Sequence, residues 1–209
     1  MAFADSRPSD RDPAYLPHAN TQVAKLVVAG GFGVGKTTLI RAVSEVRSLH
    51  TEEIMTAPSA VTDSLEFTPE KTTTTVNMDF GRLTLDTGNL ANQPVLYLFG
   101  TPGQARFEQT WKDTTYGAHG GLVLLDLRRP EASYEALDLI ERSGMPYAVA
   151  VNQFPGAPFH SDPALRTALN LADDTPLTHC NALDRESSID ALITLVQHAV
   201  HVYRREAAS

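Results

Sequence analysis

Residues 30–37 read GGFGVGKT, which satisfies the pattern G-x-x-x-x-G-K-[ST] of a phosphate-binding P-loop. The short apolar run from Val23 to Ala29 predicts a buried strand directly before it. Leu39 and Val43 follow at helical spacing, so a helix is expected to begin just after the loop. In such a succession of strand, glycine loop and helix, backbone N–H groups and the helix N-terminus hold phosphate oxygens. The sequence therefore predicts a loop that binds the phosphates of a nucleoside triphosphate.

Two side chains of this loop have expected chemical roles. The Lys36 ammonium would reach the β- and γ-phosphates, and the Thr37 hydroxyl would bind Mg²⁺. The alternative, a glycine-rich turn with a chance lysine, is disfavoured because the flanking strand and helix are both expected. The residues of this stretch expected to contact the nucleotide are Gly31, Phe32, Gly33, Val34, Gly35, Lys36, Thr37 and Thr38.

Three nearly continuous apolar runs predict further strands, at Val95 to Phe99, Leu122 to Leu125 and Tyr147 to Val151. Runs without alternation are typical of parallel strands that are covered by helices on both faces. Helical spacing of apolar residues predicts helices near residues 134–140 and from about residue 186 to residue 205. The expected fold is therefore α/β, with a mostly parallel central sheet and helices on both faces.

The segment around Gly81 carries a change of apolar phase. Met78 and Phe80 place apolar side chains on even positions, whereas Leu83 and Leu85 place them on odd positions. Because successive strand residues point to opposite faces, this change predicts a bulge or bend near Gly81.

Composition narrows the class of protein. The 209 residues suit one domain, here residues 23–206, after a flexible tail over residues 1–22 that shows no strand or helix period. The formal charge of -8 argues against nonspecific nucleic-acid binding, because such binding needs a basic surface. No apolar run reaches the length that spans a bilayer, and the single cysteine, Cys180, fits a reducing compartment. We therefore expect a cytoplasmic protein that reaches a membrane only through a partner.

Four further stretches resemble motifs of the small Ras-like GTPases. Residues 75–80 (TVNMDF) look like the T-x-G-x-D-F of switch I in the Rab branch, and residues 100–107 (GTPGQARF) look like the D-T-A-G-Q-E-R-F of switch II. Residues 152–154 (NQF) stand where N-K-x-D follows a strand, and residues 179–183 (HCNAL) resemble the E-C-S-A-L of the Rho branch. The combination is most similar to the bacterial Ras-like GTPases of actinobacterial conservons, which are related to the bacterial polarity GTPases.

This resemblance implies a Ras-like P-loop NTPase domain with one antiparallel edge strand, which binds GTP or GDP with Mg²⁺. The implied catalytic residues are Lys36 and Gln104, the latter to orient the attacking water. Thr75 would join Thr37 at Mg²⁺, and the Gly103 N–H would contact the γ-phosphate. The implied partners are a roadblock-domain regulatory protein and a sensor-kinase-like membrane protein. The residues implied at the base are Asn152, Gln153, Asn181 and Ala182.

Two positions depart from the family's pattern. Gly100 stands where switch II carries the aspartate that holds Mg²⁺ through water. Pro155 stands where an aspartate would accept hydrogen bonds from guanine N1 and N2. The first change leaves the Mg²⁺ dependence open, and the second leaves the choice between guanine and adenine open.

The sequence thus favours a nucleotide-dependent molecular switch with slow GTP hydrolysis that acts on partner proteins in a signalling complex. Hydrolysis is expected to be slow because a domain of this kind acting alone lacks an activating arginine. One alternative is a nucleotide-binding scaffold without hydrolysis. Another is an ATP-dependent P-loop enzyme such as a small-molecule kinase, which fits the missing guanine aspartate.

Overall fold

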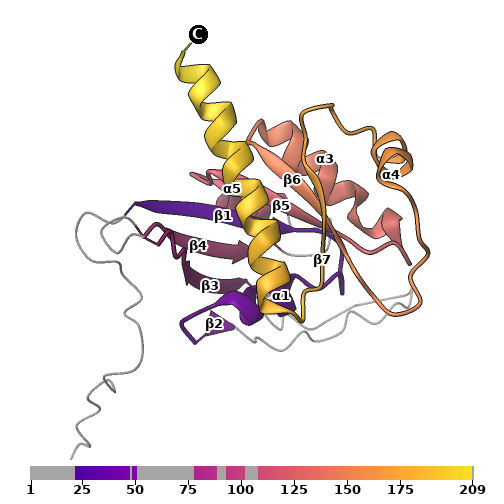
Figure 1. Ribbon diagram of the computed structural model, residues 1–209, viewed down its shortest axis with the longest axis horizontal. Helices are drawn as coiled ribbons and strands as arrows, with labels where there is room; N and C mark the ends of the chain where they lie inside the picture. The colour runs from indigo at the N-terminus through magenta and orange to yellow at the C-terminus, as the bar shows by residue number, and fades with distance from the viewer. Residues whose placement is uncertain (1–21, 48, 51–77, 89–92, 102–107, 209) are drawn as a thin grey trace, which may run out of the picture.

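The computed structural model describes residues 22–47, 49–50, 78–88, 93–101 and 108–208. Seven strands form one sheet in the order β2-β3-β4-β1-β5-β6-β7 (Figure 1). The strands are β1 (Val23–Ala29), β2 (Leu49–His50), β3 (Asp79–Thr84), β4 (Val95–Gly100), β5 (Gly120–Leu125), β6 (Tyr147–Asn152) and β7 (Leu177–Cys180). The helices are α1 (Lys36–Val43), α2 (Glu108–Thr115), the 3-10 turn η2 (Pro130–Ser133), α3 (Tyr134–Ser143), α4 (Asp162–Ala168) and α5 (Arg185–Ala207).

The sheet is mostly parallel, as the sequence predicts. Strands β4, β1, β5, β6 and β7 all run in one direction. Strand β3 runs antiparallel to β4, and the two-residue strand β2 pairs antiparallel with β3. The antiparallel strand therefore lies next to the edge of the sheet, because β2 pairs beyond it.

Helices cover both faces of the sheet, which confirms the expected layers. Figure 1 shows α5 lying across the sheet on the same side as α1, with α3 and α4 on the other side. In β5, Leu124 belongs to the cluster that contains Leu192 of α5, whereas Val123 belongs to the cluster that contains Ile140 of α3. Neighbouring residues of a strand thus enter two different cores, which explains why these strands read as continuous apolar runs.

The predicted bulge near Gly81 is wrong. Strand β3 pairs with β4 in unbroken register. Asp79, Gly81 and Leu83 are all buried, and Gly81 lies against α1, where an added Cβ would come within 2.7 Å of Ile40. Asp79 contacts Thr37 of α1, and Leu83 belongs to the core cluster that contains Ile40, so the odd positions of the strand face α1. The pattern of apolar residues did not indicate this face of the strand, because the first residue on it, Asp79, is charged.

The predicted tail over residues 1–22 lies outside the described residues except for Gln22. Among the described helices, none has both the length and the apolar character that crossing a bilayer requires.

Candidate functional site

The carboxyl ends of β1, β4, β5, β6 and β7 meet at one edge of the sheet because these strands are parallel. Ligands of open α/β sheets bind beyond this edge. The loop of residues 30–35 leaves β1 there and leads into α1. Because β3 runs the opposite way, its first residue, Asp79, lies at the same edge. The loop predicted from the sequence therefore sits where several elements can add side chains to it.

The glycine-rich loop curves into the N-terminus of α1. Gly35 has a φ of 106°, in the left-handed region that favours glycine. A Cβ there would also lie 2.5 Å from the Asn152 Nδ2 atom, so the position has no room for a side chain. Within the described part of the chain, the backbone N–H groups of Gly33 and Gly35 donate to no protein acceptor. Such donors beside a helix N-terminus are available to an anion.

Lys36 is buried at the start of α1, with 9% of its surface exposed. Its Nζ atom donates to the backbone carbonyls of Gly30 and Gly31, at 2.8 Å each. Burial lowers the pKa of Lys36 to about 8, and the negative charge of Asp79 opposes that shift. Hydrogen bonds from an ammonium to an anion are stronger than those to neutral carbonyls. A phosphate group would therefore compete well for this side chain.

Thr37, the second residue of α1, contacts a residue that the sequence analysis did not single out. Its hydroxyl donates to the Oδ2 atom of Asp79 at the start of β3. Asp79 is 8% exposed, so a carboxylate is buried directly beside the loop. Alternate residues of a strand share a face, so Asp79 stands on the same face as Leu83. That spacing was the sign in the sequence that Asp79 could be buried.

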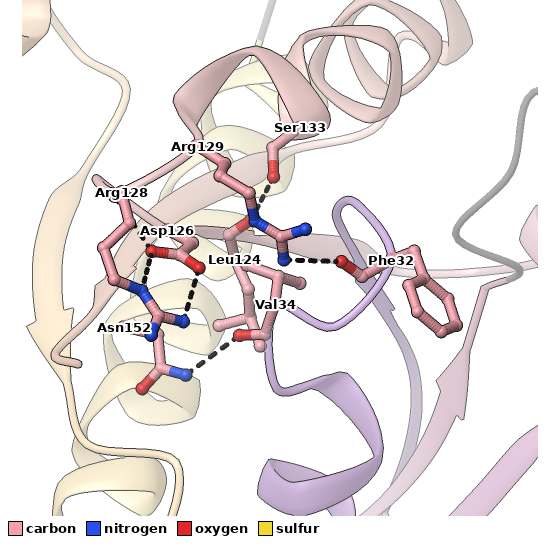
Figure 2. A network of polar contacts seen from close by, with 8 residues as sticks. All are labelled: Phe32, Val34, Leu124, Asp126, Arg128, Arg129, Ser133 and Asn152. Atoms are coloured by element: carbon pink, nitrogen blue, oxygen red, sulfur yellow. Dashed lines mark hydrogen bonds and ion pairs between the residues drawn. The ribbon is translucent and has the colours of Figure 1, made fainter. Parts of the chain in front are cut away.

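Asn152, the last residue of β6, connects the glycine-rich loop to the segment after β7 (Figure 2). Its Nδ2 atom donates to the Val34 carbonyl at 2.9 Å, and its Oδ1 atom accepts from the Ala182 N–H at 3.0 Å. Asn152 and Ala182 are both buried. The polar atoms that the sequence analysis assigned to a guanine base are thus engaged with the protein itself in this structure.

The other residues predicted at the base lie at the same edge in more open surroundings. The side chain of Gln153 is exposed. Asn181 is partly buried, and its Oδ1 atom accepts from the Leu183 N–H at 3.1 Å. Of the loop residues, Phe32 is 70% exposed and Thr38 is partly buried on α1.

Arg129 lies beside the glycine-rich loop, although no motif of the sequence predicts a role for it. Its Nη2 atom donates to the Phe32 carbonyl at 3.3 Å (Figure 2). A Cβ on Gly33 would lie 3.3 Å from the same nitrogen. In the sequence, the feature that could have pointed to Arg129 is the pair of arginines that follows β5. The structure thus adds a second positive charge beside the loop.

Arg128 forms a fixed stack near Asn152. Its side chain makes hydrogen bonds of 3.0 and 2.8 Å to the two carboxylate oxygens of Asp126 (Figure 2). These bonds hold the pKa of Asp126 below its usual range. The guanidinium lies 3.8 Å from the centre of the Phe154 ring. A planar cation and an aromatic ring therefore lie together just beyond β6.

Thr75, Gly103 and Gln104 lie outside the described residues. Their expected roles at Mg²⁺, the γ-phosphate and the attacking water stay predictions.

The Cys180 thiol at the end of β7 is buried, which raises its pKa to about 12 from 9.0. Iodoacetamide reacts with thiolate, so at pH 9 we expect it to leave the native protein unlabelled and to label the chain unfolded in urea. Above pH 9.0 the unfolded thiol ionises while the folded thiol stays protonated, so this group lowers stability as the pH rises. Mass spectrometry of the alkylated protein measures the labelling. Rapid labelling of the native protein would contradict the burial of this thiol.

A family model described as "Conserved hypothetical ATP binding protein" matches residues 28–202. The match begins within β1 and ends within α5, so it includes the glycine-rich loop and every later strand. The chain belongs to this family. Nucleotide binding, expected from the loop, thus agrees with the description of the ATP-binding family.

The assignment to the Ras-like GTPases of conservons is therefore wrong. The matching family is described by ATP binding, whereas that resemblance implied GTP. A P-loop on an α/β sheet occurs in proteins of many functions, so these features do not separate the two families. The aspartates that are typical of the GTPase motifs would separate the two families, but this chain has Gly100 and Pro155 at those positions. The roadblock-domain and sensor-kinase-like partners, implied by the resemblance alone, stay predictions.

A curated relative is an uncharacterized protein of Methanocaldococcus jannaschii. It is 28% identical over 132 residues, which cover 62% of this chain and 69% of the relative. Its name states no activity, so it adds nothing to the ATP binding that the family description gives.

Proposed function

We propose that this protein binds ATP, with the triphosphate held by residues 30–37 and Mg²⁺ beside it. The observation that carries the proposal is the buried Lys36 ammonium, which lies 2.8 Å from the carbonyls of Gly30 and Gly31 inside a glycine-rich loop. Membership of the ATP-binding family supports the same nucleotide. Residues 23–206 would form the nucleotide-binding domain.

Each part of the loop would take a separate role at the phosphates. Lys36 would leave the loop carbonyls for phosphate oxygens, and the N–H groups of Gly33 and Gly35 would donate to the same anion. Arg129, beside Phe32 and Gly33, would place a second positive charge near the triphosphate. Mg²⁺, when bound, would neutralise phosphate charge, and the Thr37 hydroxyl is the loop atom of the right chemistry to hold it.

The base side of the site supports adenine over guanine. Guanine needs an acceptor for its N1 and N2 protons, and Pro155 stands where an aspartate would supply one. The Asn152 amide is bonded within the protein and forms a fixed wall. The stack of Arg128 on Phe154 offers planar surfaces that would accept any purine. Guanine would bring its N1 and N2 protons to position 155, where no side-chain acceptor stands, whereas adenine carries no proton at N1 and no amino group at C2.

Phosphoryl transfer from ATP is the reaction that this arrangement suits. Catalysis of such transfer depends mainly on positioning and on charge neutralisation, which Lys36 and Arg129 would supply. An enzyme would release labelled phosphate from bound γ-labelled ATP in a single-turnover experiment or pass it to a small acceptor. A scaffold would bind ATP and release none.

ATP is expected to bind up to about tenfold more tightly than GTP, because the missing acceptor for guanine costs about 1 kcal/mol. Isothermal calorimetry with ATP, ADP, GTP and GDP in the presence of Mg²⁺ measures the ratio. The matched variant Pro155→Asp adds the missing acceptor and should shift the ratio toward GTP. Tighter binding of GTP by the unchanged protein would refute the adenine assignment.

A further inference from the structure

We propose that Asp79, contributed by the antiparallel strand β3, is the carboxylate that holds Mg²⁺ at the bound nucleotide, and that Gly100 is needed to admit it. This inference rests on the proposed ATP binding. It bears on the Mg²⁺ dependence, which the glycine at the end of β4 left open.

Strand direction brings Asp79 to the site. The parallel strands end at the edge where the glycine-rich loop lies, whereas β3 begins there because it runs antiparallel to β4. Asp79 is the first residue of β3 and Gly100 is the last residue of β4, so the two are neighbours across the strand pair. A carboxylate therefore reaches this edge from the adjacent strand.

Gly100 leaves the space that the Asp79 side chain occupies. A Cβ built on Gly100 would lie 3.1 Å from the Cβ of Asp79 and 3.2 Å from its Oδ2 atom. It would also lie 3.2 Å from the Cδ1 atom of Ile40, which belongs to α1. Any larger residue at position 100 would push against Asp79 from one side while α1 restricts it from another. The glycine and the aspartate are thus complementary.

The chemistry of Asp79 and Thr37 suits Mg²⁺. Their side-chain oxygens are in direct contact, and both are hard oxygen donors of the kind that this ion prefers. Mg²⁺ in nucleotide sites commonly uses one or two protein oxygens together with phosphate oxygens and water. No group of three or more His, Cys, Asp or Glu in the described residues could hold a metal alone, which fits a site completed by the nucleotide.

The burial of Asp79 also favours a cationic partner. The residue is 8% exposed, and a buried carboxylate is costly unless positive charge or hydrogen bonds compensate it. Lys36 is a nearby cation in this structure, and its charge interacts with Asp79. When Lys36 turns to the phosphates, Mg²⁺ would supply positive charge at the same carboxylate.

The test is the effect of Mg²⁺ on ADP affinity, measured by calorimetry with Mg²⁺ and again with excess EDTA. The unchanged protein should bind ADP more tightly with Mg²⁺. Asp79→Asn should lower that Mg²⁺ effect by about 10- to 100-fold and leave the affinity in EDTA unchanged or tighter. Asp138→Asn, on the exposed surface of α3, is the matched control and should keep the full effect.

A charge-conserving exchange keeps the test decisive if Asp79→Asn does not fold. Gly100→Asp combined with Asp79→Gly returns the carboxylate to the end of β4 and should restore most of the Mg²⁺ effect. Gly100→Ala alone should weaken the effect while Asp79 is still present. An unchanged Mg²⁺ effect in Asp79→Asn, or in Gly100→Ala, would overturn the inference.

The failure of ATP binding would look different. Absence of ADP and ATP binding by the unchanged protein, with and without Mg²⁺, would refute the proposed function itself. Tight binding with no Mg²⁺ effect in the unchanged protein would leave that function standing and refute the metal role of Asp79.

Discussion

Lys36→Ala is expected to weaken ATP binding by about 100-fold or more. The ammonium would make at least two charge-assisted hydrogen bonds to phosphate oxygens, and their combined loss costs about 3 kcal/mol or more. In the present structure the same atom makes two hydrogen bonds to the carbonyls of Gly30 and Gly31, so it already lies inside the loop. Calorimetry or competition with a fluorescent ADP analogue measures the change.

Two further variants separate the lost charge from the lost volume. Lys36→Met keeps a long side chain without charge and should lose ATP affinity as strongly as Lys36→Ala. Lys112→Ala removes an exposed lysine of α2 and should bind ATP normally. Unchanged affinity in both Lys36 variants, with thermal unfolding that shows a folded protein, would mean that ATP does not bind at this loop.

The sequence predicted the loop and the layers of the fold well, because both rest on local patterns. The glycines and Lys36 stand at fixed spacing between a strand and a helix, and the structure has both elements at β1 and α1. The core strands β5 and β6 are apolar on both faces, which indicates burial before any pairing is known. These features need no information from distant parts of the chain.

The position of Asp79 could not be predicted in the same way. Hydrophobic periodicity counts a charged residue as exposed, so the pattern around Gly81 indicated a bulge where the strand is regular. Its approach to Thr37 also depends on β3 running antiparallel to β4, a tertiary feature that joins residues 42 positions apart. The charge of Asp79 and the direction of β3 are the two reasons why the sequence did not predict this residue at the candidate site.

The family assignment failed for a related reason. Short motifs around the glycine-rich loop resemble those of Ras-like GTPases, but phosphate recognition by backbone N–H groups is common to many nucleotide-binding families. The residues that the motif assigns to the base lie elsewhere, at Asn152 and at position 155. The place of Asn152 in the motif predicts a contact with the base, whereas the structure shows it bonded to Val34 and Ala182.

Asn152→Ala is therefore expected to destabilise the protein even without nucleotide. The change leaves the buried Val34 carbonyl and Ala182 N–H without the partners they have now, at a cost of about 1–3 kcal/mol for each group. A combined loss of about 2–6 kcal/mol should lower Tm by about 4 °C or more in a protein of this size. Thermal unfolding followed by circular dichroism measures it, with Gln153→Ala, an exposed neighbour, as the control.

The two roles of Asn152 make different predictions for the same variant. A residue that only reads the base would lose nucleotide affinity while Tm of the free protein stayed constant, which would contradict the role inferred from its hydrogen bonds. If Asn152 holds the glycine-rich loop in place, its replacement should lower both the nucleotide affinity and the Tm of the free protein. The reason is that Gly35 lies against the Asn152 amide, which also bonds to the Val34 carbonyl of the loop. Asn152→Asp keeps the acceptor for Ala182 but loses the donor to Val34. Its ATP affinity should therefore fall like that of Asn152→Ala, since the lost bond is the one that reaches the loop.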